Sequence, residues 1–227
     1  MSVRDDVLAF LRDPAAFAAI ATDPGVWLAG LEGFALPSIA ASDDRPLRPA
    51  QEAAWRGLAD CRAGLILGPP GTGKTHLLSW LIAGYGEARI RAGLPAQTFV
   101  TAFTRNAAAN VLEGVAERQA LHLPGAPAPI YYGAPPDSGL PPGVDGLRRG
   151  EERTLREALD SGRAVVGGTI WSLYRLLAAD GAGMTAQLFD LVCIDEASQM
   201  VLGQGLMALA GLAADGRVVV AGDDQQL

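Results

Sequence analysis

Residues 68–75 decide the fold of this chain, and they read Gly68-Pro69-Pro70-Gly71-Thr72-Gly73-Lys74-Thr75. A short apolar run, residues 63–67, comes directly before them, and a helix-forming stretch, residues 77–83, follows. Together these segments make the complete G-x-x-x-x-G-K-T phosphate loop in the strand, loop and helix context that the motif requires. The sequence therefore predicts that the chain binds a nucleoside triphosphate.

Each residue type in this loop has a chemical reason. Glycines let the backbone N–H groups turn inward around the β-phosphate, while the positive end of the following helix faces the same anion. Lys74 is placed to reach the β- and γ-phosphates, and the Thr75 hydroxyl is placed to complete the coordination shell of a magnesium ion. A glycine-rich turn without a ligand is the alternative, but eight positions and both flanks agree with the phosphate loop.

Length and composition set the outer bounds. The chain has 227 residues, of which 49% are hydrophobic, so one or two domains with a substantial core are expected. It contains no apolar run of about 18 residues, and its first residues lack the apolar segment of a secretory signal. We therefore expect a cytoplasmic protein with no membrane partner. Two cysteines suit a reducing compartment, and Cys61 and Cys193 are both predicted to be buried thiols.

The net charge of −7 argues against a strongly basic nucleic-acid platform, because affinity for a phosphate backbone normally comes from clustered Lys and Arg. Net charge is a sum over the whole molecule, whereas a binding groove is local. Composition therefore lowers the expected affinity for a polynucleotide and leaves room for a local groove.

Helices and strands are expected to alternate along the rest of the chain. Helices are predicted at residues 49–60, 77–85, 106–119, 151–161, 171–179 and 200–212, and strands at residues 63–67, 97–102, 163–166, 188–194 and 217–221. This alternation favours an α/β fold with a mainly parallel sheet, covered by helices on both faces, and a ligand at the carboxyl ends of the strands.

Two segments do not fit the alternation. Residues 1–45 read as a small helical lead-in to the domain at residues 46–227. Residues 121–150 contain seven Pro and six Gly, so we expect no regular element there, but either a functional insertion or a mobile loop.

A second polar cluster follows the apolar strand at residues 188–194. Asp195 at the strand end can hold a magnesium ion through water, and Glu196 can orient and deprotonate the water that attacks the γ-phosphate. The two acids could instead cap the next helix. The end of the chain repeats the pattern with an apolar strand and a polar tip, where Gln226 could bond the γ-phosphate or the attacking water, or lie in a solvated turn.

The order and spacing of these motifs resemble superfamily 1 helicases over residues 49–227. The segments that carry the resemblance are Gln51, residues 68–75, residues 101–108, Gly168-Thr169, Asp195-Glu196-Ala197-Ser198-Gln199 and residues 222–227. The Asp-Glu-Ala-Ser-Gln form is similar to the branch typified by the nonsense-mediated-decay RNA helicase and the Okazaki-fragment nuclease-helicase, whose members generally move 5′ to 3′. The resemblance implies the first RecA-like ATPase domain of such a protein, a P-loop NTPase built as a three-layer sandwich.

The resemblance also implies roles for single residues. Gln51 would read the adenine base and so select ATP, with Mg²⁺ as its metal; a surface glutamine on a helix is the alternative. Thr104, Arg105 and Thr169 would contact the sugar-phosphate backbone of single-stranded DNA or RNA. For these three, an ordinary turn from strand to helix is the alternative.

Members of this superfamily carry a second RecA-like domain after the segment that matches Gln226. Its arginines stabilise the transferring phosphoryl group and can contribute about 10³ to 10⁵ in rate, so we expect weak hydrolysis from residues 1–227 alone. The leading hypothesis is a nucleic-acid-stimulated ATPase, the motor of a helicase or translocase. The alternative is an ATP-dependent switch or assembly module that acts on a protein partner.

Overall fold

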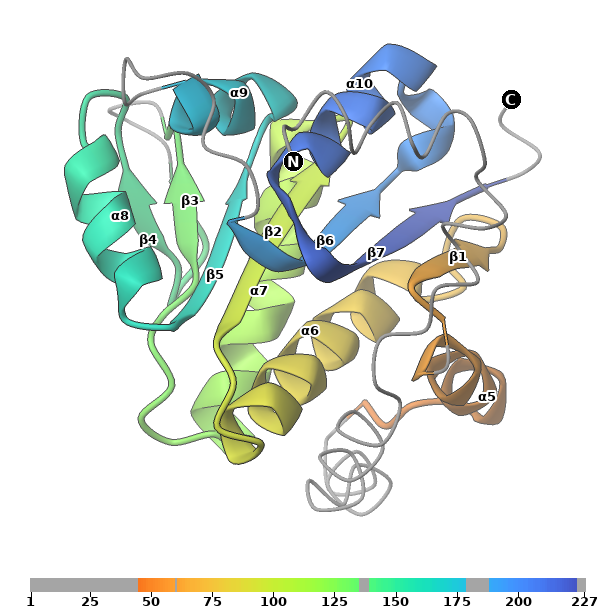
Figure 1. Cartoon of the computed structure of the whole chain (residues 1–227). Helices are drawn as coiled ribbons and strands as arrows, with labels where there is room; N and C mark the ends of the chain where they lie inside the picture. Colours follow the sequence, from red (N-terminus) through yellow and green to blue (C-terminus); the bar gives the residue numbers. More distant parts are fainter. Residues whose placement is uncertain (1–44, 60, 135–138, 179–187, 224–227) are drawn as a thin grey trace.

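The computed structural model describes residues 45–59, 61–134, 139–178 and 188–223, so most of the predicted lead-in and Gln226 lie outside the described residues. Within these ranges seven strands form one sheet in the order β1-β7-β6-β2-β5-β3-β4, and each neighbouring pair is parallel (Figure 1). The strands are β1 Ala63–Leu67, β2 Ala96–Ala102, β3 Ile130–Tyr132, β4 Asp145–Leu147, β5 Arg163–Gly168, β6 Phe189–Asp195 and β7 Leu212–Gly222. The predicted α/β fold with a parallel sheet is confirmed.

Helices pack on both faces of this sheet. In the described residues they are α5 Pro49–Ala59, α6 Lys74–Arg91, α7 Arg105–His122, α8 Glu152–Asp160, α9 Ile170–Ala178 and α10 Leu202–Ala208. Successive side chains of a strand point to opposite faces. Cys193 of β6 accordingly packs into the core beneath α5, α6 and α7, while its neighbours Val192 and Ile194 pack into the core beneath α8, α9 and α10. The result is the three-layer arrangement that the resemblance implies.

Helix α6 is longer than the stretch expected from the sequence, because its far end is anchored to the sheet. Arg89 in its last turn forms an ion pair of 2.8 Å with Asp190 near the start of β6, and both side chains are largely buried. Asp190 also accepts a hydrogen bond of 2.9 Å from the backbone N–H of Gln97 at the start of β2. These contacts join α6 to two central strands at the edge of the sheet opposite the phosphate loop.

The expectation that residues 121–150 hold no regular element is wrong. Strands β3 and β4 lie in this segment and extend the sheet beyond β5, with Ile130 opposite Val166. The prolines lie outside these three-residue strands, where the missing N–H removes no ladder hydrogen bond. High Pro and Gly content therefore limits the length of the strands here without preventing them.

The expectation of two buried thiols is half right. Cys193 is fully buried, and this burial raises the pKa of its thiol well above the ordinary range. Cys61 is exposed because α5 ends at Ala59, which leaves Cys61 in the turn before β1 rather than in the helix.

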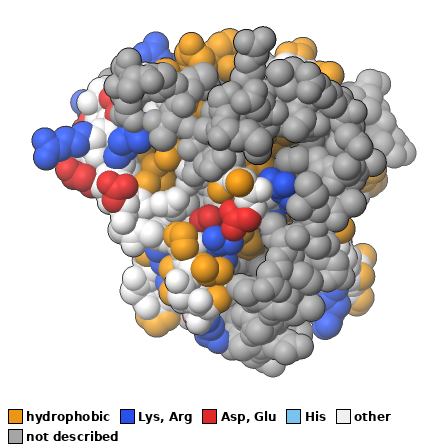
Figure 2. All heavy atoms as spheres, in the orientation of Figure 1, with side chains coloured by type: hydrophobic (Ala, Val, Ile, Leu, Met, Phe, Trp, Pro, Cys, Tyr) orange, Lys and Arg blue, Asp and Glu red, His pale blue; other side chains and the backbone are white. Residues whose placement is uncertain are grey.

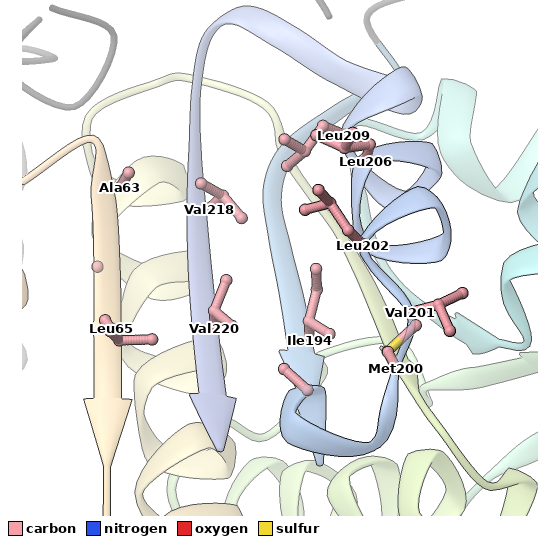
Figure 3. A pocket seen from close by; sticks show the side chains of 13 residues that line it. Ala63, Leu65, Ile194, Met200, Val201, Leu202, Leu206, Leu209, Val218 and Val220 are labelled. Atoms are coloured by element: carbon pink, nitrogen blue, oxygen red, sulfur yellow. The ribbon is translucent and has the colours of Figure 1, made fainter. Parts of the chain in front are cut away.

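The sheet is not covered evenly on the α10 side. Leu65 of β1 is 62% exposed and Leu67 is 56% exposed, and no described helix lies over them. An apolar groove runs here between β1 and α10, and Figure 3 shows its lining side chains, which include Leu65, Ile194, Leu202, Leu206, Val218 and Val220. Within the described residues, the expected cover on both faces thus holds at the central strands and is missing at β1. None of the helices in the described ranges has the length and apolar character that crossing a membrane requires.

Candidate nucleotide-binding site

The phosphate loop joins β1 to α6 along a path that only glycine follows easily. Gly71 has a φ of 78° and Gly73 a φ of 84°, in the left-handed region where side chains with a Cβ are strained. A Cβ on Gly73 would also lie 2.5 Å from Nε2 of Gln51. The base of the loop is tied to β7, since the N–H of Gly68 donates to the carbonyl of Gly222 at 3.2 Å. This winding presents the first N–H groups of an 18-residue helix to the space inside the loop.

Lys74 places its positive charge inside the loop. Its ammonium group donates to the carbonyl oxygens of Gly68 and, at 3.0 Å, of Pro69. The Thr72 hydroxyl donates to the same Pro69 carbonyl at 2.8 Å and closes the turn. A cation held at this point, beside the end of α6 that carries the positive pole of the helix dipole, makes the loop an anion-binding site.

Thr75 and Asp195 join the two halves of the predicted site. The Thr75 hydroxyl, in the first turn of α6, donates to Oδ2 of Asp195 at 2.7 Å across 120 positions of sequence. Asp195 is the last residue of β6 and is 2% exposed. A hydroxyl oxygen and a carboxylate oxygen therefore lie side by side at the mouth of the loop.

Glu196 has a strained backbone. Its φ of 52° and ψ of 35° are left-handed, and no other non-glycine residue among those described has a positive φ. Its N–H donates to Oδ1 of Asp195 at 2.9 Å, and its carboxylate accepts a hydrogen bond of 3.3 Å from the Thr104 hydroxyl. The short helical turn Ala197–Gln199 begins after Glu196 without a side-chain cap, so the Glu196 carboxylate does not serve as a helix cap.

These groups share one cleft at the carboxyl ends of β1, β6 and β7. Its lining includes Lys74, Thr75, Asp195, Glu196, Ser198 and Asp223. A family model described as an AAA domain matches residues 51–227, which is more than half of the chain. The chain belongs to the AAA domain family. No curated protein shows significant similarity to it. The family match supports a helicase-like P-loop domain, and so a nucleotide-binding domain of the kind that hydrolyses ATP.

The donor atoms of this AAA domain fit a nucleotide with a magnesium ion. Thr75 and Asp195 offer oxygen ligands, which Mg²⁺ prefers, and Mg²⁺ in phosphate sites is commonly held by one or two protein groups together with phosphates and water. No group of three or more His, Cys, Asp and Glu residues suited to a metal occurs in the part of the chain that the structure describes. The site thus suits a metal that arrives with a phosphate ligand better than one enclosed by protein alone.

Gln51 lies beside the loop, and its amide bonds to the protein backbone. Oε1 accepts from the N–H of Arg48 at 2.8 Å, and Nε2 donates to the carbonyls of Thr72 and Gly73 at 3.3 and 3.1 Å. In this geometry Gln51 fixes the start of α5 against the phosphate loop. Reading of adenine by Gln51 stays a prediction, and it requires the amide to exchange at least one of these bonds.

The three residues of this AAA domain that are predicted to contact single-stranded DNA or RNA all lie at the start of a helix. Thr104 caps α7 by accepting from the N–H of Ala107 at 3.1 Å, and Arg105 is the exposed first residue of that helix. Thr169 accepts from the N–H of Ser172 at 3.2 Å at the start of α9. Both turns follow neighbouring strands, β2 and β5, so Thr104, Arg105 and Thr169 belong to the same sheet edge as the nucleotide site. The capping alternative thus describes the local geometry of both threonines, while a role toward nucleic acid stays a prediction.

For two residues that line the cleft, no role was predicted from the sequence. Ser198 and Asp223 meet because the N–H of Asp223 donates to the Ser198 hydroxyl at 3.4 Å, which links the ends of β6 and β7. Both residues belong to segments that carry the helicase resemblance, and this was the feature of the sequence that could have indicated their place in the site. Gln226 lies outside the described residues.

On the face that Figure 2 shows, the described acidic and basic side chains lie close to one another. Figure 2 shows blue and red side chains next to one another at the edge where α8 lies, and Arg153 and Glu157 form an ion pair of 3.0 Å on that helix. The described surface in this view therefore presents no broad basic field.

Proposed function

We propose that this AAA domain is the first motor domain of a superfamily 1 helicase or translocase, which couples ATP hydrolysis to movement along single-stranded DNA or RNA. The observation that carries the proposal is the 2.7 Å hydrogen bond between Thr75 and Asp195. It brings the phosphate loop to the acidic end of β6, and a phosphate-loop ATPase needs these two elements together.

In this proposal, four residues of the chain have separate roles in ATP hydrolysis. Mg²⁺, when bound, would be held by Thr75 and Asp195 and would neutralise charge on the phosphates. Lys74 would offset the negative charge of the γ-phosphate. Glu196 would take a proton from the attacking water while the water oxygen bonds to the γ-phosphorus and the bond to the β,γ-bridging oxygen breaks. The products are ADP and inorganic phosphate.

Movement along nucleic acid requires that single-stranded DNA or RNA be bound close to the site of ATP hydrolysis. Thr104, Arg105 and Thr169 support such a grip because they follow β2 and β5, and β2 is the direct neighbour of β6. Hydroxyls and helix starts suit contacts with a sugar-phosphate backbone, and Thr104 is exposed while Thr169 is half-buried. We further propose that a second RecA-like domain completes the site. Residues 195–199 favour the branch of the nonsense-mediated-decay RNA helicase, whose members generally move 5′ to 3′, and the direction of movement of this chain stays open.

Stimulation of ATP turnover by a polynucleotide tests the proposal. We expect single-stranded DNA or RNA to raise the rate of phosphate release by the protein, and Glu196→Gln to abolish turnover while Mg-ATP binding persists in calorimetry. Arg153→Gln on α8 is the matched control, since its side chain is 93% exposed and lies outside the cleft. Turnover that is indifferent to every polynucleotide would overturn the motor assignment.

A switch that acts on a protein partner is the second candidate, and the net charge of −7 with the mixed charges on the face shown in Figure 2 favours it. This candidate predicts tight ATP binding, slow turnover and no affinity for a strand even at low salt. A motor domain should instead bind single-stranded nucleic acid with an affinity that falls as the salt concentration rises, because binding releases counterions from the phosphates.

A further inference from the structure

We propose that Arg118 is a positioning residue for Thr75, the proposed magnesium ligand, although Arg118 lies outside the nucleotide cleft. Arg118 belongs to the second half of α7 and is 2% exposed. The inference rests on the proposed function, because the position of Thr75 matters to a metal only if the chain binds Mg-ATP. It adds to that function a residue that acts on the site through α6.

The guanidinium group of Arg118 contacts the first two turns of α6. Its Nη2 lies 2.9 Å from Nδ1 of His76, and its central carbon lies 5.4 Å from the centroid of the Trp80 ring. Because an arginine side chain has only donors, Nδ1 of His76 accepts this hydrogen bond, and the ring proton of His76 is on Nε2. His76 directly follows Thr75, so Arg118 holds the residue next to the proposed metal ligand.

Arg118 is itself held by its own helix. Its Nη1 donates to the carbonyl of Gly114 at 3.0 Å and to Oε2 of Glu117 at 2.7 Å. Gly114 also lets the two helices approach closely, since a Cβ at this position would lie 2.8 Å from Cβ of Ser79. The Ser79 hydroxyl donates to the backbone carbonyl of His76 at 2.8 Å. Both the side chain and the backbone of His76 are therefore restrained where α6 meets α7.

The choice of a buried cation at this place has a consequence for the geometry of α6. Elsewhere α7 packs into the core with apolar side chains such as Leu112 and Val115, which are both 0% exposed. A buried charge costs more to desolvate than an apolar side chain of similar volume. It also provides directional hydrogen bonds, which fix the orientation of a partner more closely than apolar packing does. Arg118 thus fixes the ring of His76 in one orientation.

The start of α6 needs such a restraint from its neighbours. The phosphate loop that precedes it has positive φ at Gly71 and Gly73, and glycines restrict the backbone less than other residues do. Thr75 must nevertheless keep its hydroxyl beside Asp195, at the observed 2.7 Å. Mg²⁺ requires near-ideal octahedral geometry at about 2.0–2.1 Å, so a small displacement of one ligand lowers its affinity. Restraint of His76 by Arg118 therefore supports the metal rather than the phosphates.

Isothermal calorimetry on the whole chain tests this difference. Arg118→Met keeps an unbranched side chain and removes its donors. We expect the affinity for Mg-ATP to fall about 3- to 10-fold, less than the 10- to 100-fold typical of a residue that bonds directly to a metal ligand. The affinity for ATP in the presence of EDTA should stay within about 2-fold of the wild-type value, because the loop and Lys74 are unchanged.

A double-mutant cycle with His76 tests the route of the effect. His76→Phe keeps a ring and removes the acceptor for Arg118. If Arg118 acts through His76, the losses of Mg-ATP affinity in Arg118→Met and His76→Phe should not add in the double variant. Additive losses would overturn this route.

Val115→Ala is the matched control for a general loss of stability. It leaves a cavity on the same helix and keeps the Arg118 side chain, so thermal unfolding should occur several degrees lower. The ratio of Mg-ATP affinity to metal-free ATP affinity should remain that of the wild type in this variant. A ratio that falls as much in Val115→Ala as in Arg118→Met would overturn the positioning role.

The remaining outcomes separate this inference from the proposed function. An unchanged ratio in Arg118→Met would make Arg118 a structural contact between α6 and α7 and overturn the inference, while Mg-ATP binding by the wild type would leave the proposed function in place. Equal losses of Mg-ATP and metal-free ATP affinity would overturn it as well. Absence of Mg-ATP binding by the wild-type chain would overturn the proposed function together with the inference.

Discussion

At the scale of single residues, Glu196 combines the proposed chemistry with an unfavourable backbone. Its left-handed conformation costs a residue with a Cβ about 1 kcal/mol or more, and glycine avoids that cost. We therefore expect Glu196→Gly to be more stable than Glu196→Ala by about 1 kcal/mol in urea denaturation, although neither variant should turn over ATP. Equal stability of the two variants would show that the left-handed conformation carries no cost at this position.

Lys74 carries the electrostatic part of phosphate binding at the same scale. Replacement by Ala removes a charge-assisted hydrogen bond, which corresponds to a loss of affinity for Mg-ATP of about 10- to 100-fold. Calorimetric titration measures this loss directly. Arg91→Ala is the matched control, because Arg91 is a cation at the opposite end of α6, and it should bind Mg-ATP as the wild type does. Unchanged affinity in Lys74→Ala would contradict the assignment of the loop.

At the scale of elements, the Arg89–Asp190 pair fastens the last turn of α6 to the sheet. Burial raises the pKa of the Asp190 carboxyl above its ordinary value of 3.8, while hydrogen bonding from Gln97 and the charge of Arg89 act in the opposite direction. Arg89→Met leaves a buried carboxylate without its cation, which costs about 3 kcal/mol of unfolding free energy at neutral pH.

The pH dependence of this variant follows from the same pKa. Without Arg89 the pKa of Asp190 in the folded state rises further above 3.8. The Asp190 carboxylate therefore binds a proton more readily in the folded state than in the unfolded state. The unfolding free energy of Arg89→Met should therefore fall as pH rises from about 4 through the raised pKa, and then level off. Urea denaturation across this window measures the trend. The double variant Arg89→Met/Asp190→Asn should lose the pH dependence, and a deficit independent of pH in the single variant would contradict the argument.

Two neighbouring residues of strand β1 differ strongly in burial. Ile66 is 8% exposed and packs in the core beneath α6, whereas Leu65 is 62% exposed and lines the apolar groove. Ile66→Ala should cost about 2 to 4 kcal/mol of unfolding free energy, and Leu65→Ala well under half of that. Chemical denaturation of this matched pair compares the two faces of one strand, and similar losses would show that the face toward α10 is covered in solution.

At the scale of the whole molecule, ligand binding and folding are linked because the site uses residues from the phosphate loop, the start of α6 and the ends of β6 and β7 together. A ligand that binds only the folded state adds about 2.7 kcal/mol of stability at 100 times its dissociation constant. Mg-ATP should therefore raise the thermal unfolding temperature by several degrees, with a much smaller rise in Lys74→Ala. Absence of any shift in the wild type at saturating Mg-ATP would contradict nucleotide binding itself.

The chain's local patterns were sufficient for much of this protein. Residues 68–75 specified the phosphate loop because the positive φ values at Gly71 and Gly73 and the bonds of Lys74 to Gly68 and Pro69 depend on neighbours in sequence. The apolar runs before Gly68 and Asp195 likewise indicated strands, and the second of these is buried throughout, as predicted. The predicted ends of elements differ from the observed ones, as with α6, whose last turn is held by the distant Asp190, and with β7, which begins at Leu212 rather than at residue 217.

Tertiary structure alone decided which of these segments meet. The sheet order places β6 beside β2 and so brings Glu196 to Thr104, seats β3 and β4 at the far edge, exposes Leu65, and turns the Gln51 amide toward the loop backbone. Composition and periodicity report how a segment relates to its own neighbours along the chain. Strand pairing and side-chain contacts between segments many positions apart depend on the packing of the whole core, and that packing becomes defined only when all layers have assembled.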